Sequence, residues 1–320
     1  MQSVFTLLQY TLIFSSVLTL VAIGGAFSEH SGVINLGLEG CMSVGALAGA
    51  LVLSILNPEL PAIFIILIVI AVSIAAGLAF SALLAVASIN CSADQTLVGT
   101  AMNMMALAVT AIIARAINMS QDPNNVSTNV NFVDQRKALV LDLEIFGYKY
   151  EFNWFVIVTV IAVIVSYIVL YKTVFGLRLM SCGEHPQASA SVGINVFKMR
   201  WTGVLISGAF AGLGGICYIT AAVSQWKFEN GVAGFGFLAL AVMIFGQWKP
   251  HRIIFAALVF GFFRALSNVY FGFPFLLALQ LPSTIYNMLP YIISLIILAI
   301  TSKKSKAPKA EGIPYDVSLR

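Results

Sequence analysis

Long apolar segments that follow one another along the chain are the feature that most constrains its fold. A helix needs roughly 20 apolar residues to cross a hydrocarbon core that is about 30 Å thick. Only 9% of the residues are charged and 60% are hydrophobic, whereas soluble domains carry about 25% charge. We therefore expect an all-α, polytopic membrane protein of about nine (eight to ten) transmembrane helices. The expected spans are 4–27, 33–56, 62–89, 96–117, 153–174, 201–222, 234–248, 253–270 and 284–301.

The spacing of these segments predicts a single transmembrane domain over residues 1–302 and a basic tail over 303–320. Lys and Arg gather in the tail and in the connections at 175–200 and 249–252. By the positive-inside rule these three regions face the cytoplasm. Nine spans then place the N-terminus and the long polar loop at 118–152, in which acidic residues outnumber basic ones, on the outer side.

Two features of the apolar segments concern how the helices pack. The segment 234–248 is short and opens with "GVAGFGF". A short, Gly-interrupted span is typical of a broken helix near a transport path, and a tilted helix with a loose end is the alternative. The motifs "GALAG" at 45–49 and "GAFAG" at 208–212 are GxxxG patterns, which predict close helix contacts.

Two charged residues, Glu39 and Arg264, lie within expected spans. A charge at the centre of the bilayer costs about 2.5–3.5 kcal/mol on insertion scales, so each needs a partner or a water-filled cavity. We expect the two side chains to line or brace a pathway, as a pair. The alternative is that each extends separately to an interface.

Polar groups at membrane depth are further candidates for contact with a polar solute, although hydrogen bonds between helices are the commoner role. An aromatic face would be a second way to contact a solute, and Phe residues are numerous enough to supply one. The candidate pathway residues are Asn35, Glu39, Asn103, Phe235, Phe237 and Asn268, with Ser207, Tyr270 and Phe271 as further possibilities.

The stretch "GEHPQASASVGINVFKMRW" at 183–201 interrupts the apolar pattern with small and polar residues. Pro186 suits the first position of a helix, where its missing N–H costs nothing. Gly193 suits the left-handed conformation that ends one. The stretch therefore predicts a short cytoplasmic helix with small side chains, around which a groove of another protein closes. An ordinary amphipathic connector is the alternative.

The sequence contains no phosphate-binding loop of the form G-x-x-x-x-G-K-[ST]. We therefore expect a chain that is not an enzyme, and ATP hydrolysis, if it drives transport, in a separate ATPase subunit. His and Cys residues do not cluster, so we expect no metal and no cofactor. No interleaving of basic and aromatic residues indicates nucleic-acid binding.

Four stretches resemble one family. "GLRLMSCGEHPQASASVGINVFKMRW" at 176–201 is similar to a signature of permeases from ABC importers, in the branch that serves simple sugars, branched-chain amino acids and nucleosides. "SGVINLGLEGCMSVGALAGA" at 31–50 and "GFGFLALAVMIFGQWKPHRIIFAALVFGFFRALSN" at 234–268 resemble two further segments of that branch. "APKAEGIPYD" at 307–316 resembles the tail of the nucleoside-type permeases.

The resemblance implies a type II ABC importer-like permease in a bacterial cytoplasmic membrane, with its C-terminus in the cytoplasm. Its partners would be a cytoplasmic ABC ATPase, a second permease that forms a heterodimer with it, and an extracellular substrate-binding lipoprotein. The implied substrate is a nucleoside. The implied ATPase-coupling residues are Gly183, Glu184, His185, Pro186, Ala188, Ala190 and Gly193.

Three alternatives remain open from the sequence. A ribose- or galactose-type sugar importer would use the same architecture. A stand-alone secondary transporter or channel would carry its solute without an ATPase. A structural or assembly subunit of the membrane would have no pathway.

Overall fold

The computed structural model describes residues 2–133, 139–145, 148–221, 225–280, 282–301 and 307–316. The longer α-helices are α1 (Gln2–His30), α2 (Leu38–Ile55), α3 (Ala62–Ala85), α4 (Gln95–Gln121), α6 (Trp154–Lys172), α7 (Val174–Glu184), α9 (Val196–Thr220), α10 (Phe235–Phe245), α11 (Pro250–Val269) and α13 (Ser283–Thr301). Two short helices are α8 (Pro186–Ser191) and α12 (Pro274–Ala278). A π-helical turn, Val86–Asn90, extends α3.

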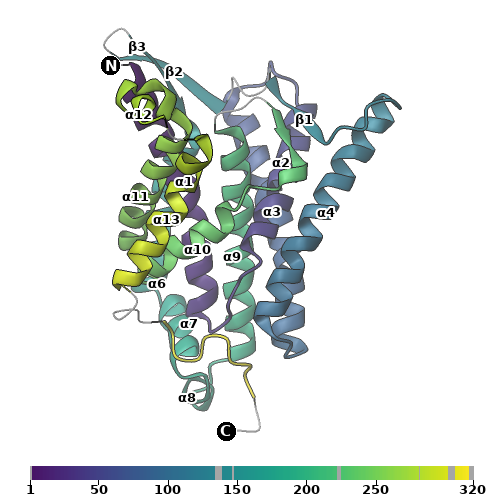
Figure 1. Ribbon diagram of the computed structural model, residues 1–320. Helices are drawn as coiled ribbons and strands as arrows, with labels where there is room; N and C mark the ends of the chain where they lie inside the picture. Colours follow the sequence, from purple (N-terminus) through teal and green to yellow (C-terminus); the bar gives the residue numbers. More distant parts are fainter. Residues whose placement is uncertain are drawn as a thin grey trace.

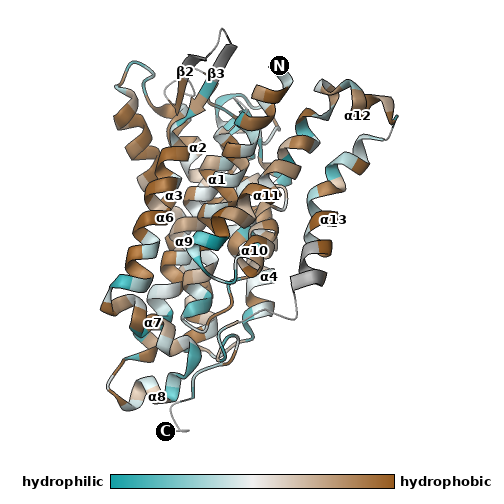
Figure 2. Ribbon diagram, turned by 90° about the vertical axis from the view of Figure 1, so that its left-hand side faces the viewer, coloured by the Kyte–Doolittle hydropathy of each residue, from teal (hydrophilic) through white to brown (hydrophobic). Residues whose placement is uncertain are grey.

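The helices form a bundle with two different ends (Figure 1). At one end, β1 (Asn129–Asn131) pairs with β4 (Gln225–Lys227), and β2 (Val140–Ile145) pairs with β3 (Tyr148–Asn153), both antiparallel. We call this the strand end. At the opposite end lie α8 and residues 307–316, and we call this the α8 end. Hydrophobic residues cover the flanks of the bundle between the two ends (Figure 2).

Seven of the described helices are long and apolar enough to cross a membrane, while Phe235–Phe245 and Ser283–Ile296 are apolar but shorter. The expected polytopic membrane protein is therefore confirmed, and the chain is a multi-pass membrane protein. The count of nine full spans is not confirmed.

Two details differ from the expected spans. The expected helix over 33–56 begins only at Leu38, because residues 31–37 form turns and extended chain in which Gly32 has a φ of +91°. The polar loop at 118–152 contains strands, which the all-α expectation did not include. Of the expected basic tail, Lys303, Lys304, Lys306 and Arg320 lie outside the described residues.

Helix α1 occupies the inside of the bundle, where it packs against α6, α9, α10 and α11. Its residues from Ile13 to Glu29 are buried on every side. A helix that is apolar all round has no preferred outer face and is expected inside a bundle. Helix α9 packs against α1, α2 and α3, so these four helices form the central part of the core.

Glycines allow α2, α3 and α9 to approach at backbone distance. A Cβ added to Gly45 of α2 would lie 2.3 Å from the Cα of Gly212 in α9. One added to Gly77 of α3 would lie 2.3 Å from the carbonyl oxygen of Gly208. The expected close contacts of both GxxxG patterns are therefore confirmed, because only glycine fits at these crossings.

Gly45→Val is expected to lower the melting temperature of the purified protein in detergent, measured by size-exclusion after heating. Overpacking of a core costs about 1–3 kcal/mol, and here the obstacle is backbone that cannot rotate away. The matched control is Ala48→Val, a half-buried position on the same helix. Equal melting temperatures for the two variants would contradict the crossing.

Candidate functional site

The N-termini of two helices, α2 and α10, meet inside the bundle, and Glu39 joins them. Glu39 lies in the first turn of α2. Its carboxylate accepts hydrogen bonds from the backbone N–H groups of Gly234, at 2.8 Å, and Gly236, at 2.6 Å. These groups belong to the start of α10, whose first amides have no partner within the helix. The negative charge also complements the positive end of the α10 dipole. Glu39 is therefore a cap that is supplied by another helix.

Glycines shape the chain around this carboxylate. Gly234 has a φ of +79°, in the left-handed region, which glycine adopts without steric cost. A Cβ on Gly236 would lie 2.5 Å from the backbone nitrogen of Glu39. The "GVAGFGF" stretch thus provides both the turn and the close approach that Glu39 needs. The expected short span is confirmed as a short helix, α10, that begins within the bundle (Figure 1).

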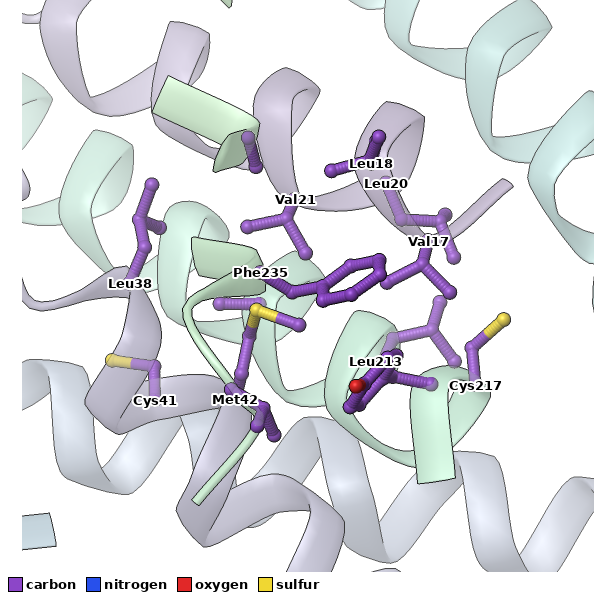
Figure 3. Close-up of a cluster of buried hydrophobic side chains, with 14 of the residues drawn as sticks. Val17, Leu18, Leu20, Val21, Leu38, Cys41, Met42, Leu213, Cys217 and Phe235 are labelled. Carbon is purple, nitrogen blue, oxygen red and sulfur yellow. The ribbon is translucent and has the colours of Figure 1, made fainter. Parts of the chain in front are cut away.

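Phe235 lies next to this cap and contacts Arg264. The Phe235 ring is buried among Val17, Val21 and Met42 (Figure 3). The guanidinium carbon of Arg264 lies 5.3 Å from the centre of the same ring, within the range of a cation–π interaction.

Tyr218 of α9 completes this aromatic group. Its ring centre lies 4.1 Å from that of Phe235, and its hydroxyl lies beside Arg264. A carboxylate, two aromatic rings and a guanidinium therefore follow one another through the core.

Among the described residues, the expected pairing of Glu39 with Arg264 is not seen. Within the described residues, no ion pair joins the two side chains. The carboxylate instead accepts hydrogen bonds from the α10 amides, and the guanidinium lies against the Phe235 ring. The negative charge of Glu39 is offset by a helix end, and the positive charge of Arg264 is offset by an aromatic ring.

The non-helical segment 31–37 is held by amide side chains of α4 and by a hydroxyl of α9. Asn103 accepts from the Gly40 N–H at 2.8 Å and donates to the Leu36 carbonyl at 2.8 Å. Asn35 donates to the Ser207 hydroxyl at 2.9 Å. These expected pathway residues therefore bind neighbouring helices, which is the commoner of the two roles considered.

Two amide atoms in the same region have no hydrogen-bond partner among the described residues. They are Oδ1 of Asn35 and Nε2 of Gln95, and both side chains are buried. Gln95 uses its other amide atom, the Oε1, to accept from the Ile34 N–H at 2.7 Å. One free acceptor and one free donor are therefore left beside the start of α2.

The remaining expected pathway residues have different positions. Phe237 follows Gly236, and its backbone N–H also hydrogen-bonds to Glu39. The Phe237 side chain is 49% exposed. Asn268 and Phe271 share a hollow of about 480 Å³ near the strand end, together with Gln2 and Tyr10. Tyr270 stacks on Tyr286, with ring centres 4.2 Å apart.

Helix α8 forms the second candidate site, at the α8 end. Pro186 occupies its first turn, and Gly193 follows it with a φ of +86°. The expected short helix and its glycine end are therefore confirmed. Exposed side chains cover its outer face, namely Glu184, His185, Gln187, Ala188, Ser191 and Val192.

Three of the seven expected coupling residues are buried within the chain itself. They are Gly183, Pro186 and Ala190. A Cβ on Gly183 would lie 2.4 Å from the carbonyl oxygen of His30, at the end of α1. These three residues therefore seat α8 on the bundle. Glu184, His185, Ala188 and Gly193 remain accessible to another protein.

Sequence reasoning missed Gln95 and Tyr218. Gln95 directly follows Asp94, whose side chain caps α4 by accepting from the Leu97 N–H at 2.8 Å. From the sequence, Gln95 therefore looks like an ordinary residue of a helix start. Tyr218 lies in an apolar run and carries no pattern of its own. Only the fold places it 4.1 Å from Phe235.

Comparisons with known proteins agree on one family. The family described as "Branched-chain amino acid transport system / permease component" matches residues 7–300. The guanosine ABC transporter permease protein NupQ of Bacillus subtilis is 39% identical over 308 residues, which cover 95% of this chain and 94% of NupQ.

Two further relatives are similar along most of their length. The nucleoside ABC transporter permease protein NupC of Lactococcus lactis is 36% identical over 95% of this chain and 94% of NupC. The putative glucose ABC transporter permease protein TsgC13 of Haloferax volcanii is 30% identical over 82% of this chain and 76% of TsgC13. No solved structure matches the chain significantly.

Glu39→Ala is expected to lower the melting temperature and to weaken solute transport, because it leaves the Gly234 and Gly236 amides unpaired. Hydrogen bonds to charged groups contribute about 1.5–3 kcal/mol each. The measurement is thermal unfolding in detergent together with uptake in cells.

Ser43→Ala is the control for this prediction, because among the described residues the Ser43 hydroxyl hydrogen-bonds back to the Glu39 carbonyl of its own helix. It is expected to leave both quantities near those of the unsubstituted protein. A Glu39→Ala protein that melts and transports like the Ser43→Ala protein would refute the cap.

Proposed function

We propose, because this chain belongs to the permease family of the branched-chain amino acid transport systems, that it is the transmembrane subunit of an ATP-driven nucleoside importer. The observation that carries the proposal is the similarity to NupQ and NupC along 95% of the chain. Both of these proteins are named for transport of guanosine or nucleosides.

The proposed source of energy is a separate ABC ATPase that binds the outer face of α8. Three arguments support this. The sequence has no phosphate loop. Helix α8 is short, and its sequence PQASAS consists mostly of small residues, which suits a groove on a partner. Gly183 at the end of α7 and Pro186 and Ala190 of α8 are buried against the bundle. A displacement of α8 would therefore be transmitted to α1 and α9.

The proposed orientation puts the α8 end in the cytoplasm and the strand end outside. Basic residues at the α8 end are Lys172, Arg178, Lys198, Lys249 and Arg252, and cytoplasmic connections carry such an excess. An extracellular substrate-binding lipoprotein would then meet the strand end, where the two small sheets provide a rigid surface.

The proposed pathway runs between this chain and a second, different permease. Helix α4 supports this arrangement, since large apolar side chains on it are exposed, among them Leu97, Met104 and Ile112. Beside the lower part of α4, the free amide atoms of Asn35 and Gln95 are candidates to bind the polar edge of a nucleoside. The Phe235 ring is buried on all sides, so we assign it to packing and not to stacking on a base.

A sugar is the second candidate substrate, because TsgC13 is named for glucose and covers 82% of this chain. The nucleoside is preferred, since NupQ and NupC are both more similar and match over a greater length.

Co-expression of the chain with its ATPase, second permease and lipoprotein is expected to give ATP-dependent uptake of labelled guanosine in proteoliposomes, with glucose as the competing substrate. Uptake of glucose and not of guanosine would refute the nucleoside proposal. Uptake by this chain alone, under an ion gradient, would refute the importer proposal.

Ala188→Trp is expected to uncouple the complex: ATP hydrolysis continues while transport per ATP falls, because a bulky ring occupies the α8 face. Ile161→Trp is the control, since Ile161 is exposed in the middle of α6, away from α8. The ratio of nucleoside transported to ATP hydrolysed is measured for both. An unchanged ratio for Ala188→Trp would refute the role of α8.

A further inference from the structure

Residues 307–316 form a strap that crosses the α8 end of the bundle (Figure 1). The N–H of Ala310 donates to the carbonyl of Gly183 at 2.8 Å, and the N–H of Gly312 donates to the carbonyl of Gly32 at 3.3 Å. Gly183 lies in the last turn of α7, shortly before α8, and Gly32 follows α1. The strap therefore ties the base of α8 to the base of α1 through the backbone.

Arg200, near the start of α9, ties the strap to a third helix. Its side chain is 1% exposed, and its Nη1 donates to the carbonyl of Ile313 at 2.9 Å. Its Nε and Nη2 atoms have no hydrogen-bond partner among the described residues. A buried guanidinium is costly without an acceptor, and the described residues offer it this one, from the strap.

Glu311 adds a contact with the end of α1. Burial raises the pKa of the Glu311 carboxyl, and its side chain hydrogen-bonds to that of Glu29. A hydrogen bond between two carboxyl groups requires one proton between them. Glu29 also accepts from the indole N–H of Trp248, in the turn before α11, so the strap is connected to that turn as well.

Tyr315 packs directly beneath α8. Its ring lies 5.4 Å from that of Phe197, edge to face, in a cluster with Cys182 of α7, Ala190 of α8 and Val196 of α9. Tyr315 also lines a hollow of about 350 Å³ that opens beside Gly193, at the end of α8. One aromatic ring of the strap therefore lies in a single buried cluster with residues of α7, α8 and α9.

We infer that the strap at 307–316 is a positioning element for α8, with Tyr315 as its principal residue, so that the surface that meets the ATPase consists of α8 and the strap together. The inference rests on the proposed function of α8. Its physical reason is that a helix of six residues is not stable by itself. Helix α8 depends for its orientation on the residues packed against it, and Tyr315 is the largest residue of the buried cluster that contains Ala190 of α8.

The test compares Tyr315→Ala with Tyr315→Phe in the complete importer complex, reconstituted in nanodiscs and proteoliposomes. Tyr315→Phe is the matched control, because the Tyr315 hydroxyl has no hydrogen-bond partner among the described residues. Both are made in a Cys91→Ser background, since Cys91 is exposed whereas Cys41, Cys182 and Cys217 are buried. A maleimide then reports whether Cys182 becomes accessible when the strap leaves.

Tyr315→Ala is expected to increase Cys182 labelling several-fold and to lower transport per ATP several-fold, while Tyr315→Phe behaves like the parent protein. Two results would overturn the inference: unchanged labelling, or increased labelling with unchanged coupling. Impairment of Tyr315→Phe equal to that of Tyr315→Ala would also overturn the role of the ring.

Gly312→Ala provides a second variant, in case Tyr315→Ala does not assemble. Gly312 has a φ of +77°, and a Cβ there would lie 2.9 Å from Ile34. It is expected to raise Cys182 labelling and to reduce coupling, and parent-like behaviour in both would refute the inference. Ala188→Trp separates the two proposals: if it uncouples and the strap variants do not, only the strap inference fails. If it does not uncouple, the docking proposal itself fails.

Discussion

The structure depends on one constraint, which is that a backbone amide within a membrane must find its partner inside the protein. Two helices of this chain begin inside the bundle, and each start exposes amides that a continuous helix would have satisfied. Glu39 supplies the partner for α10 and Asn103 supplies it for α2. The interruption of the chain at 31–37 and at the start of α10 is possible because these two side chains are present.

Glu39 is also an example of a buried charge that does not need a counter-charge. Two N–H groups and the positive end of α10 stabilise the carboxylate. Gly236 lets the α10 and α2 backbones come close enough for the Glu39 side chain to reach these groups. The Arg264 guanidinium is stabilised separately, by a cation–π interaction with the Phe235 ring. The two charges therefore stay close in the fold while each is stabilised by a neutral group.

Local rules explain why some parts could be predicted from the sequence. Pro186 and Gly193 mark the two ends of α8 through their own backbone preferences, and the GxxxG patterns indicated close packing before any partner helix was known. The partners themselves are not local. Glu39 and Gly234 are 195 residues apart, and no pattern along the chain indicates that one caps the other. The strands of the 118–152 loop were missed because its polar composition suggested a loop, although "VLDLEI" and "YKYEFN" pair in register. The contacts of the strap were missed for the same reason as those of Tyr218, since each depends on where the fold brings it.

The glycine crossings have a mechanical consequence. Where α2, α3 and α9 touch backbone to backbone, there is no layer of side chains whose rotamers could change to let one helix slide over another. These helices therefore behave as one rigid lever. A displacement of the α8 end of α9 would therefore move α2, α3 and α9 together, as one body. Any opening and closing of a pathway must then occur outside this group, among the helices that pack against its edges.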